Sequence, residues 1–193
     1  KTAGDIKFSG KTKTLAQLRQ NTAPNAWETS WIVWNYTDND HFYYFIPKEN
    51  GWELGKRDPA YPGGQRFLAT GNTPKFMLSD TKDFSISQKK NVIDIEINGE
   101  PITTFADEER PYFAGRIGFY TEDAEVAFDD ILLTQESLSG ATVSAETPVS
   151  EGKSDGTSLD KQPVASEKLA ATGYNIWNFM GFGLLLSFSG IIV

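Results

Sequence analysis

Three features of the sequence predict an all-β domain, built as an antiparallel β-sandwich. Short apolar runs recur along the first two thirds of the chain and are separated by turn residues. Within several runs, apolar and polar residues alternate, as expected of strands with one buried face. Aromatic residues make up 13% of the chain and are concentrated before residue 60, where they can supply a large core.

The first predicted strands form a hairpin followed by a third strand. They are Trp31 to Tyr36, His41 to Ile46 after a turn at Thr37 to Asp40, and Trp52 to Lys56 after a turn at Glu49 to Gly51. A Pro- and Gly-containing loop, Asp58 to Gly64, then leads to a strand at Gln65 to Ala69.

The second half repeats this pattern. Val92 to Ile97 alternates strictly and ends at Asn98-Gly99, the preferred dipeptide for a two-residue hairpin turn, before a strand at Pro101 to Phe105. The final strand pair is Gly115 to Tyr120 and Ala124 to Leu133, and a short helical turn is expected near Leu15 to Gln20.

Composition divides the chain into three parts: a sandwich at 1–134, a polar stalk at 135–172 and a transmembrane helix at 173–193. The stalk contains Ser, Thr, Ala, Gly, Pro, Lys and Glu but no aromatic residue from 135 to 172, so it is predicted to be disordered or extended. Residues 176–193 carry no charge. As a helix this run would span about 27 Å, close to the hydrocarbon core of a bilayer.

Small residues in the apolar run predict a face that packs on other membrane helices: Gly181, Gly183, Ser187 and Gly190. The expected partners are therefore the lipid bilayer and other membrane-protein subunits, with the domain on the extracellular or periplasmic side. A buried C-terminal helix of the domain is the alternative. Leu169 to Gly173 also resembles a sortase signal, although Ala stands where most such signals have Pro.

Charge and cysteine content exclude several functions. The net charge is −8 and no basic stripe is present, so nucleic acid is not an expected partner. The sequence has no cysteine, which excludes disulfides, thiolate catalysis and Cys-based zinc sites.

Several of these segments together resemble the concanavalin A-like, laminin-G-like jelly-roll superfamily. The resemblance rests on Trp31 to Lys56, Asn91 to Gly99, Gly115-Arg116-Ile117-Gly118-Phe119-Tyr120 and Val126 to Ile131. Within the superfamily the chain is most similar to domains near family 16 glycoside hydrolases and the 3-keto-disaccharide hydrolases. Members bind sugars, cleave polysaccharides, bind proteins or serve as structural modules, so the fold alone does not choose a function.

A ligand site is predicted at aromatic residues flanked by polar ones. Sugar-binding proteins place a pyranose on a flat aromatic ring beside Asp, Asn or Arg. The candidates are Trp52, Asp58, Tyr61, Arg110 and Tyr112, and the loop from Arg57 to Gln65 is the best candidate surface because Tyr61 lies there outside any strand pattern. The alternative is simple loop packing.

No catalytic residue is predicted. The strand around Asp94 and Glu96 matches part of the family 16 hydrolase signature but has Val92 where that resemblance places the nucleophile. The lone His41 has no evident Ser or Cys partner. The main expectation is a non-catalytic module for carbohydrate or protein binding, an accessory or structural subunit of a membrane complex, and the alternative is a carbohydrate-active enzyme of the same fold.

An acidic run near the last predicted hairpin suggests a structural calcium ion, because carboxylates at turns are usual calcium ligands. The run includes Asp129 and Asp130, and the resemblance implies that Asp5 shares the ion with Asp129. The alternative is a solvated acidic loop.

Overall fold

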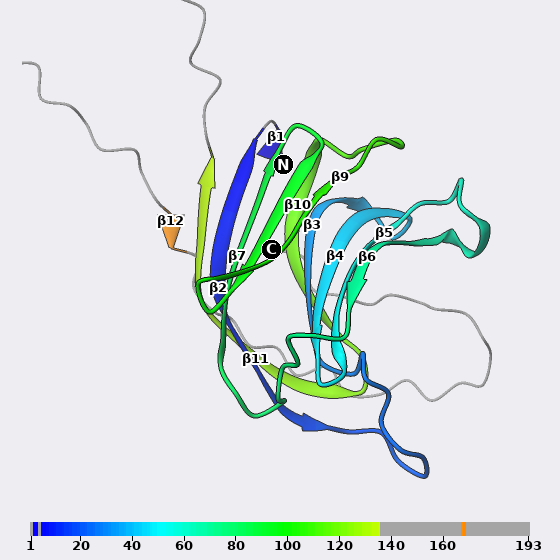
Figure 1. Cartoon of the computed structure of the whole chain (residues 1–193), viewed down its shortest axis with the longest axis vertical. Coiled ribbons are helices and arrows are strands. Elements are labelled where there is room, and N and C mark those ends of the chain that lie inside the picture. Colours follow the sequence, from blue (N-terminus) through cyan, green and yellow to red (C-terminus); the bar gives the residue numbers. More distant parts are fainter. Residues whose placement is uncertain (1, 4, 136–166, 169–193) are drawn as a thin grey trace, which may run out of the picture.

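The computed structural model describes residues 2–3, 5–135 and 167–168, which form two antiparallel sheets packed as a sandwich (Figure 1). In spatial order, the first sheet comprises β1 (Thr2–Ala3), β10 (Ala114–Thr121), β3 (Ser30–Asp38), β4 (His41–Lys48), β5 (Gly51–Arg57) and β6 (Gln65–Gly71). The second comprises β12 (Glu167–Lys168), β11 (Ala124–Gln135), β2 (Ile6–Gln17), β7 (Lys82–Lys89), β8 (Val92–Ile97) and β9 (Glu100–Ala106). A short 3-10 turn, η1 (Pro62–Gly64), precedes β6. The predicted all-β sandwich is confirmed.

The main core lies between the sheets. On β8 the side chains of Ile93, Ile95 and Ile97 are buried, whereas Asp94 and Glu96 face outward, as the alternation predicts. From the other sheet, Trp34 stacks on Tyr43 with a centroid distance of 5.4 Å. Burying each large apolar side chain contributes about 1.5–3 kcal/mol relative to leaving it exposed.

The central strands of the first sheet are buried on both faces. Strands β3, β4 and β5 carry unbroken runs of buried residues, unlike the alternating β2 and β7. The outward-facing residues of this sheet form a second apolar cluster made of Trp31, Val33, Phe42, Tyr44 and Ile46. These side chains are therefore not available as a free aromatic platform.

The predicted hairpin at Asn98-Gly99 is confirmed in its detail. Both residues have positive φ, 55° and 80°, as a two-residue turn of the mirror-image type requires. This turn fixes the register in which β8 pairs with β9.

The helical turn expected near Leu15 to Gln20 is wrong. Strand β2 continues through Gln17, which pairs with Ala124 of β11. Pairing along this long ladder outweighs the local helical tendency, and Leu15 and Leu18 are left more than half exposed (53% and 55%).

Strand β7 is a further difference, because its sequence was not among the predicted strands. Only Phe84 and Ile86 are strongly apolar there, and the strand is defined by its pairing with β2 and β8.

The stalk, the transmembrane helix and the sortase-like signal fall outside the described residues, apart from Gln135 and the short β12. The part of the chain that the structure describes contains no helix with the length and hydrophobicity of a membrane span.

Candidate functional site

Two loops meet at one end of the sandwich. The first connects β5 to β6 and begins at Asp58, and the second connects β9 to β10 and contains Arg110 (Figure 1). The Nη2 group of Arg110 donates to Oδ2 of Asp58 at 2.7 Å, and the hydroxyl of Tyr112 donates to the carbonyl of Arg57 at 2.7 Å. We call this region the Asp58 end: Asp58, Tyr61, Arg66, Glu109, Arg110 and Tyr112.

Local backbone chemistry shapes the first loop. Oδ1 of Asp58 accepts a hydrogen bond from the amide of Ala60 at 3.1 Å, which is a typical turn of an Asp side chain onto its own backbone. Gly63 and Gly64 both have positive φ, 79° and 67°, and the amide of Asp58 donates to the carbonyl of Gly64. The loop therefore closes directly after β5 and projects Tyr61 outward.

A buried ion pair supports the Asp58 end from below. Nζ of Lys56 lies 2.6 Å from Oδ2 of Asp107, and both side chains are almost completely buried, at 0% and 1% exposed. Lys56 also donates to the backbone carbonyls of Glu109 and Arg110, so the second loop is fixed to β5. The hydroxyl of Tyr43 donates to the same Asp107 oxygen at 2.7 Å.

The pKa values reflect these contacts. Burial, followed by the hydrogen bond to Asp107, raises the pKa of Tyr43 far above its usual value. Burial, with the nearby charges of Asp58 and Asp107, raises the pKa of Tyr112 to about 12. Burial alone would raise the pKa of Asp58, but the hydrogen bonds from Arg110 and the Ala60 amide outweigh it and hold that pKa below its ordinary value. Both phenols are therefore neutral hydrogen-bonding groups at neutral pH, and Asp58 is ionised.

The outer layer of the Asp58 end combines an aromatic ring with exposed charged groups of both signs. The Tyr61 residue is 42% exposed, and the Arg66 guanidinium lies 5.8 Å from the centre of its ring. Arg66 pairs with Glu109 at 2.9 Å, and the side chains of Glu109 and Arg110 are 59% and 51% exposed. Such a surface can stack on an apolar ligand face while donating and accepting hydrogen bonds.

Four of the five predicted ligand residues therefore lie together, and the fifth lies elsewhere. Trp52 is at the opposite end of β5 from Asp58, roughly 20 Å away at about 3.3 Å per residue. Its ring packs on Phe45 and its Nε1 group donates to the carbonyl of Thr73 at 2.9 Å. Whether any of the five binds a ligand stays a prediction.

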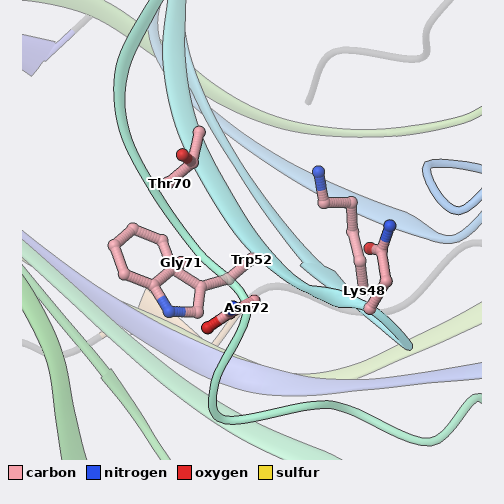
Figure 2. A pocket seen from close by; sticks show the side chains of 6 residues that line it. Lys48, Trp52, Thr70, Gly71 and Asn72 are labelled. Atoms are coloured by element: carbon pink, nitrogen blue, oxygen red, sulfur yellow. The ribbon is translucent and has the colours of Figure 1, made fainter.

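An open pocket of about 450 Å³ surrounds the accessible edge of Trp52 (Figure 2). Figure 2 shows the indole and Thr70 on one side of the pocket and Lys48 on the other. Its lining consists of Lys48, Asn50, Trp52, Thr70, Gly71 and Asn72.

The residues expected to hold calcium are not brought together as a set. Asp129 pairs in register with Lys11, whereas Asp5 precedes Ile6, the partner of Gln135, so roughly 20 Å of strand separates the two carboxylates. Asp5 accepts a bond from the amide of Lys90 and Asp130 pairs with Lys11 at 2.8 Å. No group of three or more metal-ligating side chains occurs within the described residues, and calcium binding stays untested.

The residues considered for catalysis have ordinary partners. Asp94 accepts hydrogen bonds from the hydroxyls of Thr104 and Ser87, and Glu96 is exposed on the same face of β8. Nδ1 of His41 lies 2.7 Å from Asp38 in the β3–β4 turn, and its ring packs edge-on against Tyr112.

Sequence reasoning did not identify Lys56, Asp107, Tyr43 or Arg66. Lys56, Tyr43 and Arg66 lie inside strands, where the sequence pattern predicts that a charged or phenolic side chain faces outward. Strand β5 also carries Glu53 and Arg57, so no local pattern marks Lys56 as the buried charge that requires a buried partner.

Comparison with known proteins adds to this geometry. A scan against protein-family models and a search of the curated proteins gave no match. Among solved structures, the chain is similar to the carbohydrate-binding module CBM66 from Bacillus subtilis, with a TM-score of 0.53 and 11% identity over 66% of this chain and 73% of that one. It is also similar to a variant of human galectin-16, with a TM-score of 0.52 and 14% identity over 70% of this chain and 91% of that one. At these identities the likeness shows a jelly-roll-like sandwich fold.

Proposed function

We propose that this protein is a non-catalytic carbohydrate-binding module and that its ligand contacts the Asp58 end. The observation that carries the proposal is the exposed Tyr61 ring in the loop that begins at Asp58, the partner of Arg110; the ring centre lies 5.8 Å from the Arg66 guanidinium. The likeness in fold to a solved carbohydrate-binding module supports the same class.

The chemistry of the Asp58 end suits a sugar. The C–H face of a sugar ring is apolar and packs on an aromatic face, while its hydroxyls both donate and accept hydrogen bonds. Asp58 and Glu109 supply acceptors, and Arg66 and Arg110 supply donors. Because Lys56 binds the carbonyls of Glu109 and Arg110, the backbone of the second loop loses little conformational freedom on binding.

The enzymatic alternative has weaker support. A retaining glycosidase needs two carboxyls about 5–5.5 Å apart, one of them able to deliver a proton. At the Asp58 end, Asp58 and Asp107 are each paired with a cation, and the pKa of Asp58 is lowered, so that carboxyl is a poor proton donor.

The composition of 135–193 extends the proposal. An uncharged apolar run after a polar stalk supports attachment of the module to a membrane, with the domain on the outer side and other membrane subunits as partners. These residues lie largely outside the described part of the chain, so this extension rests on sequence alone.

Affinity electrophoresis of the 193-residue protein in gels containing β-glucan, xylan, arabinan, galactan, mannan, fructan or pectin tests the binding function. We expect retardation by at least one polysaccharide, and loss of most of that retardation in Tyr61→Ala. Trp27→Ala is the matched control, because Trp27 is an aromatic residue with the same 42% exposure at a different place in the fold. Free migration in every gel, or retention unchanged by Tyr61→Ala, would count against the proposal.

A further inference from the structure

The pocket beside Trp52 lies where β6 packs closely against the indole at Gly71. A Cβ atom at Gly71 would lie only 2.4 Å from Nε1 of Trp52, so glycine is needed for β6 to approach the ring. Phe45 stacks on the indole and Thr73 accepts its N–H, so its orientation is fixed while 8% of the residue remains exposed. The pocket therefore has a rigid apolar floor.

Neutral polar groups surround this floor. Asn50, Thr70 and Asn72 are exposed, and their amide and hydroxyl groups can each donate and accept hydrogen bonds. The charge of Lys48 is balanced locally, since its Nζ group lies 2.8 Å from Oε2 of Glu53, a residue that is 7% exposed. A net-neutral lining with dual donor and acceptor groups fits a neutral, hydroxyl-rich ligand better than an anion.

The volume and position of the pocket agree with that chemistry. About 450 Å³ lies within the range of roughly 300–1,000 Å³ typical of small-molecule sites. Trp52 lies near the start of β5 and Asp58 directly follows its end, so the two are roughly 20 Å apart. An extended chain of sugar units can therefore reach from one to the other.

We infer that the Trp52 pocket is a second saccharide subsite, which takes a neutral sugar unit of the same polymer that contacts the Asp58 end. This inference rests on the proposed carbohydrate-binding function. Two linked contacts raise the affinity for a long oligosaccharide over a short one, because the second contact forms at high effective concentration.

NMR titration of the ¹⁵N-labelled 193-residue protein tests the inference. The probes are the hexasaccharides and the corresponding trisaccharides of the same seven polysaccharides: β-glucan, xylan, arabinan, galactan, mannan, fructan and pectin. The indole N–H of Trp52, assigned with Trp52→Phe, reports on the pocket, and the backbone amides of Tyr61 and Arg110 report on the Asp58 end. We expect one hexasaccharide to shift both sets of signals and to bind at least about tenfold more tightly than its trisaccharide.

Variants separate the two sites. Asn50→Ala combined with Asn72→Ala should remove the shift of the Trp52 indole and reduce hexasaccharide affinity about tenfold, the expected effect of losing two hydrogen bonds. The control is Gln20→Ala, which removes an exposed amide from the loop after β2. It should change neither the shift of the Trp52 indole nor the hexasaccharide affinity.

Each outcome decides the inference. A hexasaccharide that shifts only Tyr61 and Arg110 overturns the second subsite and leaves the proposed function standing. A shift of Trp52 alone supports the pocket as a sugar site and overturns the placement of the ligand at the Asp58 end. Absence of shifts with all probes overturns both.

Discussion

Asp58 joins two loops because each of its oxygens has its own partner: the Ala60 amide inside the first loop and the Arg110 guanidinium from the second. The side chain is almost completely buried, at 3% exposed, whereas Arg110 is half exposed. A buried carboxylate in this position needs these donors to remain ionised.

This arrangement predicts a pH-dependent contribution to stability. Because the pKa of Asp58 is lowered in the folded protein, its contribution is complete above the unfolded pKa of about 3.9 and is lost as pH falls through the folded pKa. Asp58→Asn should therefore reduce the free energy of unfolding more at pH 7 than at about pH 2.5. Urea denaturation at both pH values measures this, and an equal loss at both would contradict the ionised pair.

A larger loss of stability is predicted for substitution of Lys56, because neither its side chain nor that of Asp107 reaches solvent. Lys56→Met removes the cation that lies 2.6 Å from the buried Asp107 carboxylate and leaves it with Arg66, whose Nη1 lies 4.0 Å away, so it should cost about 3–5 kcal/mol. Adding Asp107→Asn to Lys56→Met should recover part of that loss, since the uncompensated charge is then gone. A double-mutant cycle by urea denaturation checks this, and strictly additive losses would show that the two residues do not interact.

The residues of the Asp58 end could be predicted only in part from the sequence. Tyr61 can be identified from the sequence because it lies in a Pro- and Gly-containing loop, outside any strand whose buried face would explain an aromatic residue. Arg110 and Asp58 are predicted only because Arg and Asp are common sugar-binding residue types. Their contact at 2.7 Å forms because the fold brings together two residues 52 positions apart in sequence. Trp52 was grouped with them, but it belongs to the other end of β5, and no local pattern reveals which end of a strand will meet which loop.

At the scale of single elements, the glycines of two hairpin turns differ in how much space surrounds them. Gly51 has φ of 131°, and a Cβ there would lie 1.9 Å from the carbonyl oxygen of Gly71. Gly99 has φ of 80° but faces open space.

The same substitution should therefore have unequal effects. Gly99→Ala introduces backbone strain alone and should cost about 1 kcal/mol. Gly51→Ala adds a clash with backbone and should cost several times as much. Comparison of the two urea denaturation midpoints tests this, and equal midpoints would show that β6 does not pack on the β4–β5 turn as described.

The strands show where sequence patterns succeed. Strict alternation in β8 and the Asn98-Gly99 turn are local signals, and both are confirmed. The end of β2 is decided by pairing with Ala124 and its neighbours, more than 100 positions away, so the residues near Leu15 carried a local helical tendency that the fold overrides. Strand β7 lacks strong apolar character and depends on its two neighbours in the same way.

At the scale of the whole molecule, the main core cluster, among the residues that the structure describes, lies between Ile6 and Leu133. A fragment of residues 1–135 should therefore fold without the rest of the chain, giving a cooperative thermal transition and a dispersed NMR spectrum. A fragment that remains unfolded would show that the sandwich requires residues 136–193 or a partner.

The central claim is that a sugar binds at the Asp58 end. The most direct measurement is a crystal structure of the protein with the oligosaccharide that it retains in affinity gels. We predict a sugar ring on Tyr61, with hydroxyls hydrogen-bonded to Arg110 and to Asp58 or Glu109. A bound sugar that contacts none of these residues would contradict the claim.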